Sequence, residues 1–559
     1  MKSIFCTFLL FSAFFILSCS HTERVAEKEP VHIVNIINFI RQTEPRIDEI
    51  TDKVLFETVY QQILMLRKYD LPGTFLLQYD ALIDPVYQTL MKDSLNGSSE
   101  IGGWWEITQP QVEAAGLKWR GRYSWDWHAN VGFSIGYTPA EREKLVDVYM
   151  TKFKSIFNKY PASVGCWFID AHTLSYMHEK YQVKASCNMK DQVGTDGYSM
   201  WGGYWNNAYY PSRNNAYMPA QNAENQIPVP IFRMLGSDPI YQYDASLGTR
   251  EQSVVTLEPV FQGEGLGGSN LNWVRYFFKS TFEDPALNFT YAQVGQENSF
   301  TWDKMRKGLS EIQIPILDSL QKQGLIRIET LSESAEWFKS KYPVTPPTAT
   351  SSLSDFKNEG HKTVWYNSRF YRANILWKDT HFRFRDLHLF DERMASKYLG
   401  QVEETPHCTY TTLPILDGFL WSTDKERAGI RLVRILEDGT SAEILCGIPS
   451  IITPDTNTMI VKWLEEGTVS EYKLTFTEKN IELSASATNR PWALEFTVAD
   501  GMQLPFHIIN ESGIKAEIEN FEYELGCAVG KIIVPKEKDL FVFRILPQNN
   551  QITIDCSLR

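Results

Sequence analysis

The sequence has 559 residues, of which 43% are hydrophobic, 22% charged and 13% aromatic, a composition typical of globular proteins and a length that allows several domains. Its net charge is −13 and no run is rich in Lys and Arg, which argues against nucleic acid or an anionic membrane face as the main partner. A neutral ligand or a metal ion is electrostatically easier to bind.

The first 19 residues read as a targeting segment rather than as part of the fold. Lys2 provides a positive start, residues 4–17 are apolar, and Ser18-Cys19 follows. An apolar stretch this short is a signal peptide rather than a membrane span. Its end resembles a bacterial lipoprotein signal, which implies lipidation of Cys19, a tether over residues 20–30 and an anchor in the cell envelope, at the outer membrane. An ordinary cleaved secretory signal is the alternative.

Residues 31–342 alternate between strand and helix patterns. Apolar strand patterns occupy 31–39, 74–79, 100–107, 163–169, 183–186, 230–235, 289–295 and 325–329. Helical patterns cover 51–69, 83–91, 138–159, 302–322 and 330–342, and two of them open with the capping boxes Thr138–Glu141 and Thr330–Glu333. This alternation predicts an α/β fold with a parallel sheet, closed or nearly closed into a seven-stranded-type (β/α) barrel. The sequence lacks glycine-rich nucleotide-binding motifs.

The composition changes after the barrel. Residues 343–359 begin with a Pro-, Thr- and Ser-rich run and read as a linker. Residues 360–559 contain short alternating runs, such as 430–435, 459–463 and 471–476, separated by turn signals. They predict an antiparallel β-sandwich as a second domain.

Catalytic side chains of a parallel barrel lie at the carboxyl ends of its strands. That rule selects Asn38 and Arg41, Asp80, Trp104 to Glu106, Asp170 and His172, and Gln296 to Asn298. Glycoside hydrolysis uses one protonated and one ionised carboxyl group, and we choose Asp170 and Glu297 as this pair. The alternative for either residue is a helix cap, a role that Asp170 fits well because Thr173 follows.

Two aromatic segments provide candidate substrate contacts. Residues 201–217 alternate aromatic rings with amides, and residues 122–130 read RYSWDWHAN. Rings cover the apolar faces of sugars, while amides and Arg bond their hydroxyl groups. The candidates, with the strand-end residues Trp104 and Trp105, are Trp125, Trp127, His128, Trp201, Trp205, Tyr209 and Arg213. The alternative is that these aromatic side chains pack inward.

The run GCWFIDAHTLSYMHEKYQV resembles the glycoside hydrolase/deacetylase superfamily, in which the fourth barrel strand ends in G-x-W-x-x-[ED]. The resemblance implies Asp170 as nucleophile and Glu297, on the seventh strand, as general acid. Across most of the mature chain, TLSESAEWFKSKYP, VWYNSRFYR and FRDLHLF are similar to a two-domain lipoprotein family of gut bacteria whose function is unknown.

The sequence departs from the metal-dependent deacetylases of this superfamily. They bind a metal through an Asp on strand one and an H-x-x-x-H pair on strand three, whereas residues 35–38 and 102–106 contain neither. We therefore expect no metal or cofactor, and we expect His128 and His172 to serve as hydrogen-bonding groups. Cysteine spacing shows no zinc motif and leaves open both a Cys166–Cys187 disulfide and free thiols.

These observations predict a metal-independent glycoside hydrolase that acts on an oligo- or polysaccharide. Two alternatives stay open. One is a non-catalytic glycan-binding lipoprotein, and the other is a polysaccharide deacetylase with an atypical metal site.

Overall fold

The computed structural model describes residues 30–558, except 245–246, 248–254, 261–265, 487, 489 and 536–540. The signal segment, Cys19 and most of the tether lie outside these residues, so the lipid anchor stays a prediction. Within the described part of the chain, no helix is both long and apolar enough to cross a membrane.

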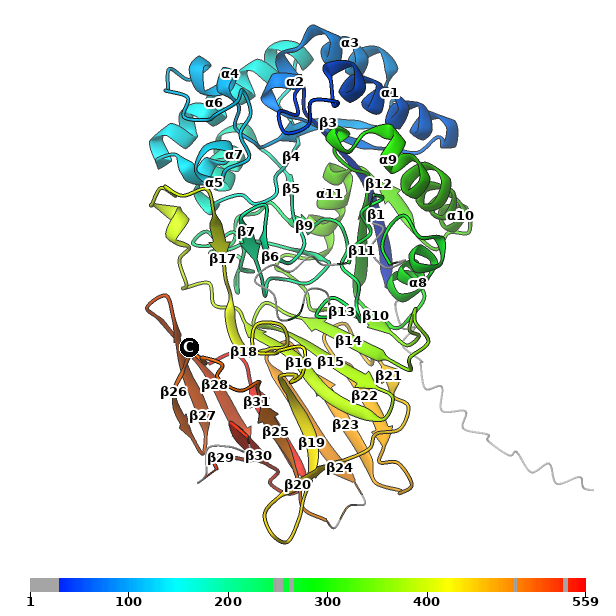
Figure 1. Ribbon diagram of the computed structural model, residues 1–559, viewed down its shortest axis with the longest axis vertical. Coiled ribbons are helices and arrows are strands. Elements are labelled where there is room, and N and C mark those ends of the chain that lie inside the picture. The colour runs from blue at the N-terminus through cyan, green and yellow to red at the C-terminus, as the bar shows by residue number, and fades with distance from the viewer. Residues whose placement is uncertain are drawn as a thin grey trace, which may run out of the picture.

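The first part of the chain forms a parallel sheet with helices packed around it (Figure 1). Its order is β11-β1-β2-β3-β4-β5-β9-β8, with β12 also paired to β1. The strands are β1 (Val31–Ile40), β2 (Thr74–Leu77), β3 (Glu100–Trp104), β4 (Ser163–Gly165), β5 (Ala185–Asn188), β8 (Ala208–Tyr209), β9 (Ile231–Arg233), β11 (Phe289–Val294) and β12 (Arg327–Glu329).

This sheet is an open half-barrel, whereas the sequence predicts a closed or nearly closed barrel. The short strand β8 pairs antiparallel with β9 and occupies the edge of β9 that closure would need. Among the described strands, none therefore joins β9 to β11.

Helices follow the strands much as the helical periodicity predicts. They are α1 (Asp52–Tyr69), α2 (Tyr79–Ile83), α3 (Pro85–Ser94), α4 (Gln109–Ala114), α5 (Ala129–Gly132), α6 (Pro139–Phe157), α7 (Ala171–Tyr181), α8 (Leu271–Phe282), α9 (Trp302–Arg306), α10 (Ile314–Lys322) and α11 (Leu331–Lys341). Both predicted capping boxes are confirmed, since Thr138 and Thr330 each accept the amide of a Glu that bonds back.

Strand alternation in β1 separates two apolar cores. Ile33, Ile37 and Phe39 belong to the cluster inside the half-barrel, which Leu331 and Phe338 of α11 also enter. The alternate residues of β1 contribute to the larger core between the sheet and its surrounding helices. Helix α11 therefore fills the half-barrel from one side.

The second part consists of two antiparallel sheets that share one apolar core. The larger contains β10 (Ala286–Leu287), β13 (Thr348–Ser352), β14 (Lys362–Asn367), β15 (Tyr371–Lys378), β16 (His381–Leu389), β18 (Leu413–Asp417), β19 (Gly429–Ile435), β20 (Ser441–Glu443), β25 (Trp492–Thr497), β29 (Lys531–Ile533) and β30 (Phe543–Leu546). The other contains β21 (Ser450–Ile452), β22 (Met459–Leu464), β23 (Glu471–Phe476), β24 (Asn480–Ser486), β26 (Phe506–Asn510), β27 (Gly513–Ile518), β28 (Phe521–Val529) and β31 (Gln551–Asp555).

The predicted linker is part of this second fold. Residues 348–352 form the fully buried strand β13, because their small Thr, Ala and Ser side chains fit between β10 and β14. The two parts also interleave, since β17 (Cys408–Tyr410) leaves the second part and pairs with β7 (Tyr198–Met200), which pairs in turn with β6 (Gln192–Thr195) (Figure 1). The chain therefore does not divide cleanly at residues 343–359.

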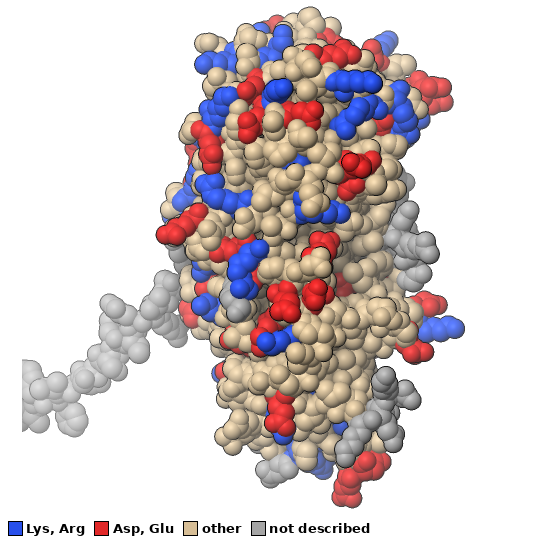
Figure 2. Space-filling view, turned by 90° about the vertical axis from the view of Figure 1, so that its left-hand side faces the viewer, with Lys and Arg blue, Asp and Glu red and all other residues tan. Residues whose placement is uncertain are grey.

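Charged side chains of both signs are interspersed over the helix-bearing end of the face shown in Figure 2. The six cysteines that the structure describes are buried and free. The Cys166 amide bonds the Cys187 carbonyl, so the two residues are neighbours as expected, but as free thiols rather than as a disulfide.

Candidate active site

A cavity of about 410 Å³ opens beyond the carboxyl ends of β1, β3, β5 and β11. Four carboxylates line it: Glu106, Asp196, Glu258 and Glu297. Three cationic side chains, Arg41, Arg46 and Lys190, and the aromatic residues Trp125, Trp127, Trp167, Tyr198 and Phe300 complete most of its wall. Mixed charges and flat rings at this edge of a parallel sheet mark it as the candidate site.

Arg41 organises the centre of the cavity. It directly follows β1, and its Nε and Nη2 donate to both oxygens of Glu106 at 2.9 and 2.8 Å. Its third nitrogen, Nη1, lies 2.9 Å from Oε2 of Glu297. The guanidinium also lies over the Trp125 ring, 4.1 Å from its centroid. One buried Arg therefore brings two buried carboxylates together.

The two carboxylates have different surroundings. Glu106 accepts a further hydrogen bond from Gln78 Nε2 at 2.9 Å, so three donors hold it. Glu297 Oε1 accepts one hydrogen bond from Ser299 at 2.7 Å, whereas its Oε2 has only the ion-pair contact with Arg41 Nη1 among the described residues. Burial raises the pKa of Glu297, and the charge of Glu106 adds to that effect while Arg41 opposes it. The pKa of Glu297 is thus shifted toward the protonated form that a general acid needs.

Trp125 and Trp127, which the sequence suggested as substrate contacts, form an aromatic wall of the cavity beside these groups. Their ring centroids are 6.3 Å apart, and the guanidinium of Arg46 lies 5.2 and 5.3 Å from them. Arg46 is held in turn by both oxygens of Glu44. Trp125 is itself buried, and its Nε1 has no hydrogen-bond partner within the described chain.

Asp170 does not line the cavity. It is the N-cap of α7 and accepts hydrogen bonds from the Thr173 amide and hydroxyl at 2.9 and 2.7 Å, and from Ser134 Oγ at 2.6 Å. Arg142 Nη1, fully buried, completes its shell at 3.1 Å. The helix-cap alternative for Asp170 is confirmed, and the structure does not bring Asp170 to Glu297.

Several other residues that the sequence suggested also lie away from the cavity. By strand alternation Asn38 falls on the helix-facing side of β1. Trp104 stacks on Phe39 inside the half-barrel at 4.3 Å, and Trp105 packs against Tyr149 of α6. His128 Nδ1 lies 3.8 Å from Asp126, and His172 Nε2 lies 3.1 Å from Glu143.

The aromatic segment 201–217 packs inward, which is the alternative that the sequence left open. Trp205 stacks on Trp365 with centroids 4.4 Å apart, and the Tyr209 hydroxyl donates to the Ala216 carbonyl. Arg213 pairs with Glu179 at the surface. The physical reason is the second part of the chain, which covers this segment and gives its rings a dry partner surface.

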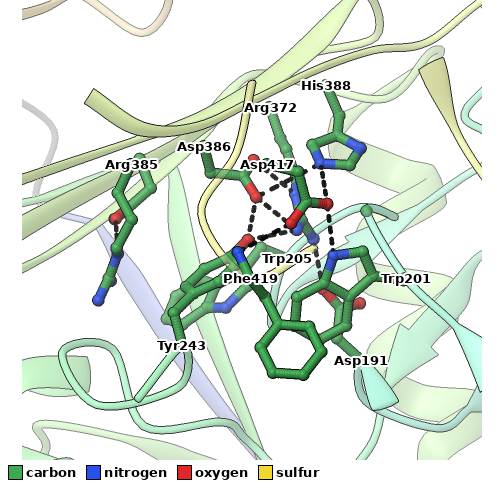
Figure 3. A network of polar contacts seen from close by, with 12 residues as sticks. Asp191, Trp201, Trp205, Tyr243, Arg372, Arg385, Asp386, His388, Asp417 and Phe419 are labelled. Carbon is green, nitrogen blue, oxygen red and sulfur yellow. Dashed lines mark hydrogen bonds and ion pairs between the residues drawn. The ribbon is translucent and has the colours of Figure 1, made fainter. Parts of the chain in front are cut away.

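A buried ionic network lies behind one wall of the cavity (Figure 3). Arg372 of β15 binds both oxygens of Asp386 at 3.0 and 2.9 Å, and its Nη1 lies 2.5 Å from Asp191. Asp191 sits between the cavity-lining residues Lys190 and Gln192. Trp201 donates to Asp417 at 2.7 Å, so its indole belongs to this network rather than to the cavity.

Asp80 is buried in α2 near the cluster and does not line the cavity. Burial raises the pKa of Asp80 to about 7, from 3.8. Between pH 3.8 and about pH 7 the folded protein keeps Asp80 protonated, whereas the unfolded chain releases this proton. The folded state therefore loses stability progressively as the pH rises through this range. At pH 8 we expect Asp80→Asn to raise the free energy of unfolding by a few kcal/mol, and therefore to raise the thermal midpoint. At pH 4 we expect both quantities to stay close to those of the wild type. Thermal melts at both pH values test this, with exposed Asp93→Asn as the control; an equal midpoint at pH 8 would contradict it.

The sequence predicts Asp170 and Glu297 as the catalytic pair and leaves out Glu106. It belongs to the strand-end group Trp104 to Glu106, and the same rule that selected Glu297 selects it. The sequence could not show that Arg41, 65 residues earlier, would bind it. Glu258 enters the cavity from a loop and Tyr198 from β7, and neither carries a comparable sequence signal, whereas Trp167 is the tryptophan of the G-x-W-x-x-[ED] motif.

Neither a family model nor a curated protein matches the sequence. Among solved structures, the chain is similar to a putative glycoside hydrolase/deacetylase from Parabacteroides distasonis, with a TM-score of 0.53 and 14% identity over 69% of this chain and 91% of that one. A probable polysaccharide deacetylase from Pseudomonas aeruginosa PAO1 aligns at a TM-score of 0.34 and 9% identity, over 56% and 92%. The first likeness shows that this chain has a glycoside hydrolase/deacetylase-type fold, as the sequence resemblance implies.

Proposed function

We propose that this protein is a carbohydrate-active hydrolase that cleaves a glycosidic bond of an oligo- or polysaccharide in the cavity described above. The observation that carries the proposal is the pair Glu106 and Glu297, two buried carboxylates bound to one guanidinium, of which Glu297 has a raised pKa. The aromatic wall beside them suits the flat apolar face of a sugar ring.

In this proposal Glu297 is the general acid. Its carboxyl proton passes to the glycosidic oxygen as the bond to the anomeric carbon breaks, and the sugar that leaves departs as an alcohol. Glu106 supplies the negative charge that stabilises the cationic sugar. Water then adds its hydroxyl group to the anomeric carbon, and the proton that this water releases returns to the Glu297 carboxylate. Arg41 keeps both carboxylates in place and is a positioning residue.

The donor set favours hydrolysis of a glycosidic bond over metal-dependent deacetylation. The described residues that line the cavity include neither His nor Cys, and Arg41 already occupies its two most buried carboxylates. These groups do not fit the His-rich set that a deacetylase metal requires. The likeness to the Parabacteroides distasonis structure supports either chemistry equally.

The raised pKa of Glu297 gives the proposed activity a direction with pH. A general acid works only while protonated, so kcat/KM falls as pH rises through that pKa, which lies above the ordinary 4.5. We expect this alkaline fall in a kcat/KM profile measured from pH 4 to 9. A rate that instead rises with pH across that range would contradict the assignment of Glu297.

Product analysis tests the function itself. The full chain is incubated with a broad panel of glycans in the presence of a chelator, and both new reducing ends and free acetate are measured. New reducing ends support the proposal. Acetate that the chelator abolishes would replace it with a deacetylase, and glycan retained without either product would replace it with a binding protein.

A further inference from the structure

The loop between β13 and β14 gathers three possible metal ligands away from the cavity. Asp355, Glu359 and His361 each offer one ligand atom, and these atoms lie within 4.8 Å of one another. Nδ1 of His361 is 3.7 Å from Asp355 Oδ2 and 3.9 Å from Glu359 Oε2. Two ligands bound about 2.1 Å from one ion are separated by this much when the angle between them is roughly 120°.

His361 provides an independent reason to expect a ligand. Its residue is only 6% exposed, yet neither ring nitrogen has a hydrogen-bond partner among the described residues. A buried polar group without a partner costs free energy, and a metal ion would satisfy Nδ1 directly.

The described cations near the loop, Lys357 and Lys378, form no ion pair with its carboxylates. Within the described chain, no Lys or Arg lies at ion-pair distance from Asp355 or Glu359. Lys357, between them in sequence, places its ammonium over the Tyr241 ring at 4.5 Å instead. The two carboxylates thus leave a local negative charge that one divalent cation would neutralise.

Asp355 is already oriented as a metal-binding carboxylate needs to be. Its Oδ1 accepts the Lys357 amide at 2.8 Å and the Tyr241 hydroxyl, and its Oδ2 accepts the amides of Glu359 and His361 at 3.0 and 3.2 Å. Hydrogen bonds of this kind fix the direction of a ligating carboxylate. Glu359, whose side chain is exposed, can close the remaining distance by rotating.

We propose that Asp355, Glu359 and His361 bind one divalent cation of the Zn²⁺ class. One imidazole nitrogen with two carboxylate oxygens suits Zn²⁺ better than Ca²⁺, which prefers oxygen ligands alone. The ion would hold the β13–β14 loop in the conformation in which Asp355 accepts the Tyr241 hydroxyl.

Calorimetric titration of the chelator-treated full chain with ZnCl₂ tests this site, with thermal melts alongside. We expect one ion per chain, a thermal midpoint that the chelator lowers and Zn²⁺ restores, and at least tenfold weaker binding in Glu359→Gln and His361→Gln. Exposed His507→Gln is the control and should bind as the wild type does. Glu359→Gln removes an exposed charge and keeps the test valid if His361→Gln fails to fold. Absence of saturable Zn²⁺ binding, or unchanged affinity in Glu359→Gln, would overturn the proposal.

Discussion

Glu297→Gln is expected to lower the rate of glycan hydrolysis by a factor of about 10² to 10⁴, the range that a positioned general acid contributes. Gln has nearly the same shape but carries no acidic proton for the leaving oxygen. Arg41 retains both bonds to Glu106, so the centre of the cavity keeps its arrangement. The measurement is kcat on the best glycan substrate, with Kd for that glycan measured in parallel.

The comparison of rate with affinity identifies the role of Glu297. We expect Kd within a few-fold of the wild type, because the aromatic wall is unchanged. Glu311→Gln, which alters an exposed Glu paired with Arg306, serves as the matched control. Unchanged kcat in Glu297→Gln would remove this residue from the chemistry, even if hydrolysis itself is observed.

Arg372→Ala is expected to be the most destabilising change at the junction of the two parts. It leaves Asp191 and Asp386 buried without the cation between them (Figure 3). Removal of one partner of a buried ion pair typically costs about 3–5 kcal/mol. Because Asp191 lies between two residues of the cavity wall, we also expect weaker glycan binding in the protein that folds.

The matched control is Arg213→Ala, which removes an exposed Arg paired with Glu179. Exposed pairs contribute about 0–1 kcal/mol, so its thermal midpoint should stay close to that of the wild type. Scanning calorimetry of the two variants and the wild type makes the comparison. Equal midpoints for Arg372→Ala and the wild type would show that the network does not hold the two parts together.

Local sequence patterns predicted most elements of the first part. The capping boxes at Thr138 and Thr330 and the apolar runs of β1 and β11 are determined by neighbouring residues, so a single sequence is enough to find them. The prediction of a linker over residues 343–359 was wrong because Thr348–Ser352 has the composition of a loop. This segment is a buried strand only because β10 and β14 pair with it on either side.

The candidate site was harder to predict because long-range packing decides it. Asp170 and Glu297 both follow strands, but their partners differ. Asp170 caps a helix and pairs with the buried Arg142, whereas Glu297 pairs with Arg41, which also binds Glu106. Trp201 and Trp205 look like sugar platforms in the sequence, but the second part of the chain covers them. The spacing of residues in a sequence does not predict which surface a distant part of the chain will cover.

The most direct measurement compares Glu106→Gln with Asp170→Asn in the release of reducing ends, expressed per folded protein at a temperature below both thermal midpoints. We expect Glu106→Gln to lose at least a hundredfold in rate, because the ionised carboxylate opposite the acid is gone. We expect Asp170→Asn to be less stable, since its Arg142 loses a buried partner, but to retain a rate within a few-fold of the wild type. Loss of activity in Asp170→Asn with full activity in Glu106→Gln would contradict the assigned pair and return the nucleophile to Asp170.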